Sequence, residues 1–314
     1  MRIVFAGSPA AAVPSLEALS ARHEIAAAVT RAPSPLGRRR VLTPTPVAQA
    51  AERLGLPVIE ADRLDEEASG RILALEPQLC AVVAYGGMVR EPLLSAPEHG
   101  WLNLHFSLLP DYRGAAPVQR ALIDGRRVTG VSVFRLVPEL DAGPVVRMRE
   151  VEIADGATAG ALLDELAEIG ARELAAAVDA VAAGTAVFEE QRGAATLAPK
   201  LSLADGALDL AATAPALLAR WRGVTPEPGA HAMVDGERVK LLALARSGAE
   251  PLPPGRAELA GRAAIVGTGS APLELVEVQP AGKRPMSGAD WLRGRGGSAT
   301  FALPEAGVAT EGRA

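Results

Sequence analysis

An amide, an imidazole and a carboxylate stand at the ends of two apolar segments of this chain. Asn103 and His105 alternate within the run Trp101–Phe106, and Asp141 comes shortly after the run Gly130–Val137. An imidazole can take up a proton near neutral pH, a carboxylate can orient it and stabilise its charge, and an amide can donate to a developing oxyanion. These three groups suit acyl or formyl transfer to an amine, which attacks directly and needs no serine or cysteine nucleophile.

Each of these residues also has an ordinary structural explanation. A lone histidine is often a satisfied core residue, an asparagine often caps a helix or strand, and an aspartate beside Gly-Pro is usually a turn former. Alternation along a strand places Asn103 and His105 on one face. If the Gly130–Val137 strand lies beside Trp101–Phe106, Asp141 stands at the same end of the sheet as His105. The chemical interpretation therefore depends on how the two strands pair.

The surrounding segments alternate between strands and helices. Apolar runs predict strands at Arg2–Ala6, Glu24–Val29, Pro57–Ile59 and Gln78–Tyr85, and helices at Val13–Leu19 and Pro46–Leu54. Buried strands joined by helices favour an α/β fold with a parallel sheet. Ligands of such sheets bind outside the carboxyl ends of the strands. The polar end of Trp101–Phe106 therefore lies where a ligand is expected.

The character of the chain changes after a long predicted helix, Thr158–Gly184, with Thr158 as its N-cap and Gly184 as its stop signal. Beyond about residue 190, short β-prone pieces are separated by glycine and proline. They are Ala230–Val234, Arg238–Leu244, Ala263–Gly267 and Leu273–Val278. A small all-β barrel behind the α/β domain fits this pattern.

Composition narrows the class of protein. The 314 residues are 49% hydrophobic and 22% charged with a net charge of −5, which excludes an intrinsically disordered chain. The single Cys80 excludes an internal disulfide and a cysteine-based zinc site, so we expect a cytoplasmic protein without a metal. Gly7 and Pro9 interrupt the apolar opening, so we expect no secretory signal. No apolar stretch is long enough to span a membrane.

The acidic balance argues weakly against a dedicated nucleic-acid binder, but the charge is uneven. Residues 201–314 hold 12 basic and 12 acidic side chains, so the excess of acid lies entirely in residues 1–200. Arginines gather at 38–40, and basic residues gather again at 283–295. The net charge therefore hides two local basic segments.

Several motifs together resemble those of the 10-formyltetrahydrofolate-dependent formyltransferases. They are Asn103-Leu104-His105, Ser107-Leu108-Leu109-Pro110, Arg113-Gly114-Ala115-Ala116-Pro117 and Leu140-Asp141-Ala142-Gly143. The opening Arg2–Pro9, the segment Ala198–Leu201 and the segment Glu277–Met286 are similar to those of the branch that formylates initiator tRNA. The resemblance runs nearly from end to end.

The resemblance implies a Rossmann-like formyltransferase domain at 1–189, a linker at 190–206 and a smaller OB-like, tRNA-binding domain at 207–314. It implies that the formyl group of 10-formyltetrahydrofolate passes to the α-amine of methionine on initiator tRNA, without a metal and in a monomer. Asn103, His105 and Asp141 would be catalytic. The folate site would be lined by Ser107, Leu108, Leu109 and Pro110, with Met88 and Val89 as further neighbours.

Both basic segments are candidates for phosphate contacts: the resemblance places the 31–40 loop at the family's tRNA-reading insertion, and an excess of positive charge points to the segment 283–295. Arg38, Arg39 and Arg40 would contact tRNA phosphates, which a guanidinium binds with its fork of donors, and Lys283 and Arg284 would contact the backbone. A solvated run of surface charge is the alternative explanation of both. The 31–40 loop lacks an acidic residue usual near its start, and Glu227 replaces a common aromatic.

Other functions remain to be weighed. A sugar-nucleotide N-formyltransferase can share the trio and the folate site, but it needs neither a charge-neutral β domain nor an arginine loop. Gly7-Ser8-Pro9 does not match a dinucleotide-binding G-x-G-x-x-G motif. A protein that only binds RNA gives no reason for Asn103, His105 and Asp141 to converge.

Overall fold

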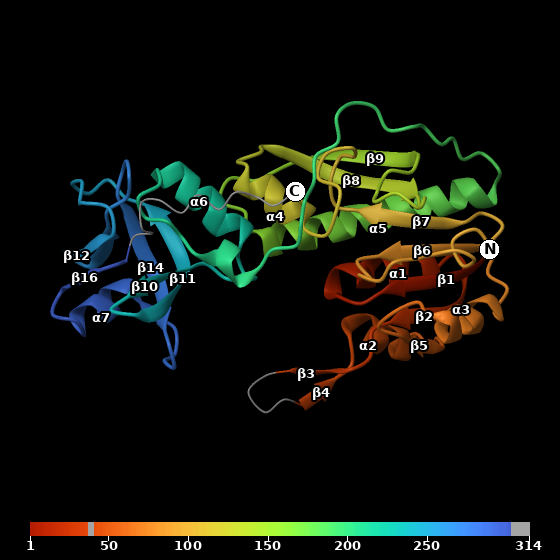
Figure 1. Cartoon of the computed structure of the whole chain (residues 1–314), viewed down its shortest axis with the longest axis horizontal. Helices are drawn as coiled ribbons and strands as arrows, with labels where there is room; N and C mark the ends of the chain where they lie inside the picture. Colours follow the sequence, from red (N-terminus) through yellow and green to blue (C-terminus); the bar gives the residue numbers. More distant parts are fainter. Residues whose placement is uncertain (37–40, 303–314) are drawn as a thin grey trace. The chain divides into compact units, whose positions relative to one another are not determined.

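The computed structural model describes residues 1–36 and 41–302, which form two compact units (Figure 1). The N-terminal unit consists of residues 1–118, 127–155 and 161–200; the C-terminal unit consists of 119–126, 156–160 and the chain from 201 onward. Two short segments from the first half of the chain thus belong to the second unit. Arg38, Arg39 and Arg40 lie outside the described residues. The predicted domain boundaries at 189 and 207 stay a prediction.

The N-terminal unit is built on a seven-stranded sheet in the order β5-β2-β1-β6-β7-β8-β9. Its strands are β1 (Arg2–Gly7), β2 (Glu24–Thr30), β5 (Val58–Glu60), β6 (Leu79–Val83), β7 (Trp101–His105), β8 (Val128–Arg135) and β9 (Val145–Glu152). The first five strands of this order are parallel, as the alternation of strands with helices predicts. Ile3, Val4 and Phe5 in β1 are fully buried, as both faces of a covered parallel strand require.

The expectation of a wholly parallel sheet is wrong for the last two strands. β8 pairs antiparallel with β7, and β9 pairs antiparallel with β8. The sequence analysis missed β9 because its residues alternate apolar and charged side chains instead of forming an apolar run. As an edge strand it is mostly exposed, and charges such as Arg147 and Arg149 protect an open sheet edge from pairing.

Helices connect the strands of this unit. They are η1 (Ala10–Ala12), α1 (Val13–Ser20), α2 (Pro46–Arg53), α3 (Glu66–Leu73), α4 (Pro117–Ile123, shared with the other unit) and α5 (Ala159–Ala182), and a small hairpin of β3 (Ser34–Leu36) and β4 (Val41–Thr43) leaves the body of the unit (Figure 1). Gly184, with a φ of +67°, follows the end of α5. Gly170 lets α5 pack closely on β7, because a Cβ there would lie 2.7 Å from Leu104 Cδ2. The long helix therefore fixes one face of the strand that carries His105.

The C-terminal unit is an antiparallel sheet in the order β10-β11-β14-β13-β12-β16, with β15 paired to β14. Its elements are η2 (Leu203–Gly206), α6 (Ala214–Gly223), β10 (His231–Val234), β11 (Glu237–Arg246), β12 (Arg256–Ala260), β13 (Ala263–Val266), β14 (Leu273–Pro280), β15 (Met286–Ser287), α7 (Gly288–Arg293) and β16 (Ser298–Thr300). The two edges of this sheet meet where Val234 bridges Phe301. The sheet thus closes towards a small barrel, as OB-like domains do.

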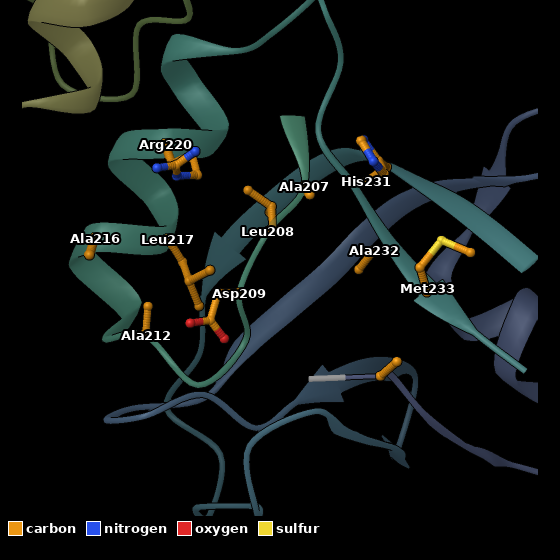
Figure 2. A pocket seen from close by; sticks show the side chains of 11 residues that line it. Ala207, Leu208, Asp209, Ala212, Ala216, Leu217, Arg220, His231, Ala232 and Met233 are labelled. Atoms are coloured by element: carbon orange, nitrogen blue, oxygen red, sulfur yellow. The ribbon is translucent and has the colours of Figure 1, made fainter. Parts of the chain in front are cut away.

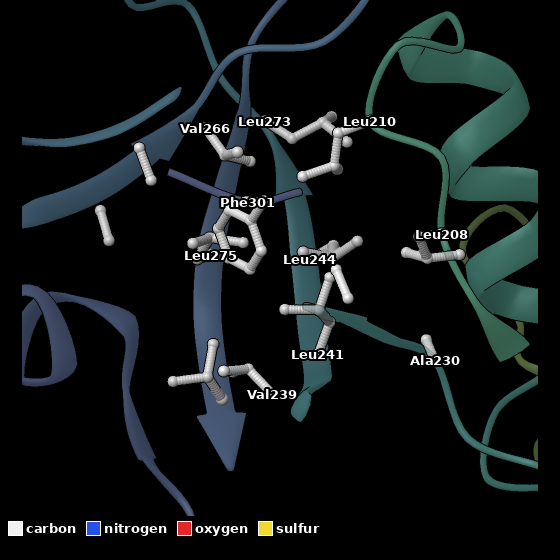
Figure 3. Close-up of a cluster of buried hydrophobic side chains, with 14 of the residues drawn as sticks. Leu208, Leu210, Ala230, Val239, Leu241, Leu244, Val266, Leu273, Leu275 and Phe301 are labelled. Carbon is white, nitrogen blue, oxygen red and sulfur yellow. The ribbon is translucent and has the colours of Figure 1, made fainter. Parts of the chain in front are cut away.

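A core of Leu, Val and Ala fills this barrel (Figure 3). Leu241, Leu275 and Phe301 are each about 1% exposed and lie at its centre. Trp291 of α7 packs on Phe301, with 5.6 Å between the ring centroids. The predicted fold class, an α/β formyltransferase-type domain followed by a smaller all-β domain, is confirmed.

Candidate active site

The strand β7 carries Asn103 and His105 to the carboxyl end of the parallel part of the sheet. It lies between the parallel β6 and the antiparallel β8, and His105 stands opposite Ser132 of β8. Side chains two residues apart share one face of a strand, so Asn103 and His105 point to the same side. His105 is only 5% exposed, whereas Asn103 is half-buried. An accessible amide and a buried imidazole thus share one face.

The imidazole of His105 is held by a backbone carbonyl. Its Nε2 lies 2.9 Å from the carbonyl oxygen of Tyr112, and its ring meets that of Phe134 edge-on with 6.4 Å between centroids. Because a carbonyl can only accept, Nε2 carries a proton in this arrangement. In the neutral ring the lone pair therefore belongs to Nδ1.

Burial decides the charge of His105. Loss of hydration lowers the pKa of His105, while the Asp141 carboxylate and the Tyr112 carbonyl oppose this effect and raise it. Desolvation is the largest of these influences. The ring is therefore neutral at physiological pH, with Nδ1 ready to accept a proton.

Asp141 brings its carboxylate to the same nitrogen. Its Oδ2 lies 3.8 Å from His105 Nδ1 and accepts a hydrogen bond of 2.7 Å from the backbone N–H of Gly114. The separation from Nδ1 is longer than a hydrogen bond, so the carboxylate faces the imidazole electrostatically. Asp141 has a φ of +46°, a left-handed backbone conformation that few residues other than glycine adopt.

Asp141 reaches His105 by a different route from the one the sequence analysis expected. β7 and β8 are neighbours, but β8 runs antiparallel, so its carboxyl end at Arg135 lies beside Leu102 near the start of β7. The two strands therefore do not end at the same edge of the sheet, and that argument is wrong. The loop between β8 and β9 carries Asp141 back to His105 instead.

Two further residues of the site come from the segment predicted as a linker, and sequence reasoning missed them. Thr196 Oγ1 accepts a hydrogen bond of 2.8 Å from the N–H of Tyr112, whose carbonyl holds His105. Gln191 Nε2 donates to the carbonyls of Asp141 and Gly143 at 2.8 and 2.9 Å. These contacts span 48 to 84 residues, so no spacing within a motif reveals them.

The predicted folate-site residues form a tight turn after β7. Ser132 Oγ donates to the carbonyl of Ser107 at 2.7 Å and accepts from the N–H of Leu109 at 3.1 Å. Ser107 and Leu109 are 1% and 5% exposed, whereas Leu108 and Pro110 are half-buried. The turn is therefore rigid, and Leu108 and Pro110 are its more accessible members. Sequence reasoning also missed Ser132, which is completely buried.

The segments after β6 and β7 leave the same edge of the sheet, because these strands are parallel neighbours. Met88 follows β6 and is 68% exposed, an unusual environment for a large apolar side chain, while Val89 packs against the core. An exposed apolar side chain beside a polar edge suits a ligand with a flat ring and polar substituents.

The predicted tRNA contacts are only partly described. Arg38, Arg39 and Arg40 fall between β3 and β4, outside the described residues. Lys283 and Arg284 are exposed in the turn between β14 and β15. The nearby Arg293 and Arg295 form ion pairs with Asp290 and Asp235, so their charge is partly neutralised.

A separate hollow of about 590 Å³ lies within the C-terminal unit (Figure 2). Alanine and leucine side chains line most of it, with Asp209, Arg220 and His231 among them. Arg220 already donates to the carbonyl of Asp205 at 3.0 Å, and His231 Nδ1 lies 3.2 Å from the carbonyl of Gly229. Arg220 and His231 are thus engaged by the protein itself.

Residues 1–36 and 41–302 contain neither a clustered metal site nor a membrane-spanning helix. No group of three or more His, Cys, Asp or Glu side chains in this part of the chain is arranged to hold a metal ion. No helix within it is long and apolar enough to cross a membrane.

Comparison with known proteins matches both units to one family. Residues 1–178 match the family described as formyl transferase, and residues 200–296 match the formyl transferase C-terminal domain. The chain is 60% identical to a methionyl-tRNA formyltransferase of Leifsonia xyli subsp. xyli over 96% of this chain and 100% of that protein. It is 59% identical to the one of Clavibacter sepedonicus over 94% of this chain and 97% of that protein.

This chain belongs to the methionyl-tRNA formyltransferase family. It is therefore an enzyme, and its resemblance to the folate-dependent formyltransferases is confirmed.

Solved structures share the fold at lower identity. The sugar 3N-formyl transferase WlaRD aligns with a TM-score of 0.66 at 14% identity, covering 90% of this chain and 99% of that chain. HypX from Aquifex aeolicus, in complex with tetrahydrofolic acid, aligns with a TM-score of 0.64 at 17% identity. The alignment covers 93% of this chain and 47% of that chain. Such identities establish the fold alone. The near-complete match to tRNA formyltransferases leaves the sugar-nucleotide alternative disfavoured.

Proposed function

We propose that this enzyme transfers the formyl group of 10-formyltetrahydrofolate to the α-amino group of methionine esterified to initiator tRNA, as a cytoplasmic monomer. The observation that carries the proposal is the buried imidazole of His105, held at Nε2 and facing Asp141 at Nδ1. The identity of 59–60% to methionyl-tRNA formyltransferases over nearly the whole chain supports the choice of acceptor.

The reaction forms a bond between the amine nitrogen and the formyl carbon, and it breaks the bond from that carbon to N10 of the donor. His105 Nδ1 takes up the proton that the attacking amine loses. That proton is then available to the departing N10. A neutral imidazole is required for the first step, and burial of His105 supplies it.

Asn103 and Asp141 stabilise the charges that this transfer creates. Asn103 lies on the same strand face as His105, and its amide donates to the formyl oxygen as negative charge develops there. Asp141, 3.8 Å from Nδ1, stabilises the imidazolium that forms. Orientation of the ring comes mainly from the Tyr112 carbonyl. Asp141 therefore contributes more by stabilising the charge of the imidazolium than by orienting the His105 ring.

The folate donor supplies an activated formyl group on N10. The edge of the sheet beyond β6 and β7 fits such a ligand, because it combines the exposed Met88 with the rigid turn Ser107–Pro110. Within that turn Leu108 and Pro110 are accessible for contact, whereas Ser107 and Leu109 maintain its shape.

The acceptor is bound through its phosphates in this proposal. Lys283 and Arg284 are exposed in the C-terminal unit, and Arg38, Arg39 and Arg40 supply a second basic segment. Lysine and arginine contacts to phosphate give affinity and register and carry little sequence information.

A comparison of two acceptors, each assayed separately, tests the proposal. The purified protein is given 10-formyltetrahydrofolate together with either methionyl initiator tRNA or an amino-sugar nucleotide, and release of tetrahydrofolate and formylation of each acceptor are measured. We expect formylation of the tRNA alone. Formylation of the sugar nucleotide with none of the tRNA would overturn the proposal.

A further inference from the structure

The side chain of Gln191 connects two loops through all of its hydrogen-bonding capacity. Its Oε1 accepts from Arg113 Nε at 3.1 Å and from the terminal nitrogen Nη2 of the same guanidinium at 2.5 Å. Its Nε2 donates to the carbonyls of Asp141 and Gly143 at 2.8 and 2.9 Å. A glutamine amide offers two donor hydrogens and two acceptor lone pairs, so this one is fully used.

The two loops that Gln191 joins carry the partners of His105. Arg113 stands between Tyr112, whose carbonyl holds His105 Nε2, and Gly114, whose N–H holds the carboxylate of Asp141. The distance between Nδ1 and the carboxylate therefore depends on how these loops are placed against each other.

Asp141 needs such a tether because of its own backbone. Its left-handed φ of +46° is less favourable than ordinary backbone for a residue with a Cβ, even though aspartate adopts it more readily than most, so contacts around it help to hold it. The nearby Gly143 packs closely on β8, since a Cβ there would lie 1.8 Å from the carbonyl oxygen of Arg135. Gln191 donates to the carbonyls of both residues and so holds the backbone on either side of Ala142.

We infer that Gln191 is a positioning residue for formyl transfer, which keeps the Asp141 carboxylate facing His105 Nδ1. The inference rests on the proposed roles of His105 and Asp141. Gln191 touches neither imidazole nor carboxylate in the described contacts, so it acts through the loop and not on the reacting atoms.

The substitution Gln191→Met tests this inference, because methionine has similar length and offers no strong donor or acceptor. We expect kcat to fall by about tenfold to a hundredfold, as a displacement near 1 Å at a catalytic group does, with KM for both substrates unchanged. Gln191→Glu is the second variant: it keeps the acceptor for Arg113 but loses the donor to the Asp141 and Gly143 carbonyls. Thermal melting and tetrahydrofolate binding show that each variant is folded.

Gln78→Met is the matched control. Gln78 lies in the same unit just before β6, at the far end of the sheet, where its Oε1 accepts from the N–H of Arg2 at 2.9 Å. We expect this variant to retain the unsubstituted enzyme's kcat. An equal drop in kcat in Gln78→Met and Gln191→Met would mean that replacing any glutamine slows the enzyme, which overturns the inference.

A double variant separates positioning from general damage. If Gln191 acts through Asp141, Gln191→Met adds little to the decrease already caused by Asp141→Asn, because the carboxylate it positions is gone. Decreases that multiply in full in the double variant would overturn the inference, as would normal kcat in both Gln191 variants. A normal rate for Asp141→Asn alone would overturn the proposed role of Asp141 as well, which distinguishes the two failures.

Discussion

The end of β7 and the turn between β14 and β15 are the two surfaces to which we assign functions, and they are built in opposite ways. At the end of β7, His105 is buried and its Nε2, the Asp141 carboxylate and the Gly114 N–H each have a defined partner. In the turn, Lys283 and Arg284 are exposed. Proton transfer depends on sub-ångström placement, whereas a phosphate can be attracted by a mobile charge. Substitutions should therefore change the rate at the first surface and the affinity at the second.

The largest effect is expected from removing the imidazole. His105→Ala should lower kcat by about 10²–10⁴-fold, because it removes the proposed general base, while KM for tRNA changes little. Steady-state kinetics with charged initiator tRNA measure both constants. His105→Gln, which fills more of the space against Phe134, controls for the change in packing. Normal turnover in both variants would contradict the role of His105 as the base.

The amide of Asn103 should matter nearly as much. Asn103→Ala should lower kcat by about 10²–10³-fold, the usual cost of removing one oxyanion donor. Asn103 is the only asparagine in the chain, so selective ¹⁵N-asparagine labelling gives a single side-chain amide signal. That signal should shift when a folate carrying a formyl group binds and should shift less with tetrahydrofolate. Equal shifts with both ligands would argue against contact with the formyl oxygen.

The carboxylate of Asp141 should tune the pKa of His105. Burial places the pKa of His105 below its ordinary value of 6.5, and Asp141 opposes this shift. In Asp141→Asn the pKa should therefore fall further, so the neutral imidazole persists to lower pH. Histidine NMR titration measures this, with the His105 signal identified by its absence in His105→Gln. A higher pKa in Asp141→Asn would contradict the electrostatic role.

The placement of Asn103 and His105 could be predicted from the sequence because it depends on local alternation. Asn103 and His105 share a strand face by alternation alone, and the apolar runs of β1, β2 and β6 mark buried strands. The direction of β8 could not be predicted this way, since an apolar run has the same appearance in a parallel and an antiparallel strand. Asp141 thus lies near His105, as expected, but the argument from the ends of the two strands was wrong.

Residues that contribute through hydrogen bonds to distant parts of the chain could not be predicted from the sequence. Gln191 and Thr196 fall in the segment predicted as a linker, where polar residues are ordinary. Only folding brings them to Asp141 and Tyr112, which lie 50 and 84 positions away in the chain. Ser132 was hidden in another way, because a serine within an apolar strand gives no sign of which backbone groups it will bind.

The smallest effect is expected at the basic turn, where it distinguishes the two surfaces most directly. Replacing Lys283 and Arg284 by alanine should raise KM for tRNA several-fold and leave kcat and KM for the folate unchanged. The slope of log(kcat/KM) against log[salt] should become shallower by about one for each phosphate that the protein no longer neutralises. Arg246 and Arg262 are also exposed in this unit, so their double alanine variant removes the same charge elsewhere. If both double variants flatten the salt dependence equally, the tRNA responds to the overall charge of the unit and not to this turn.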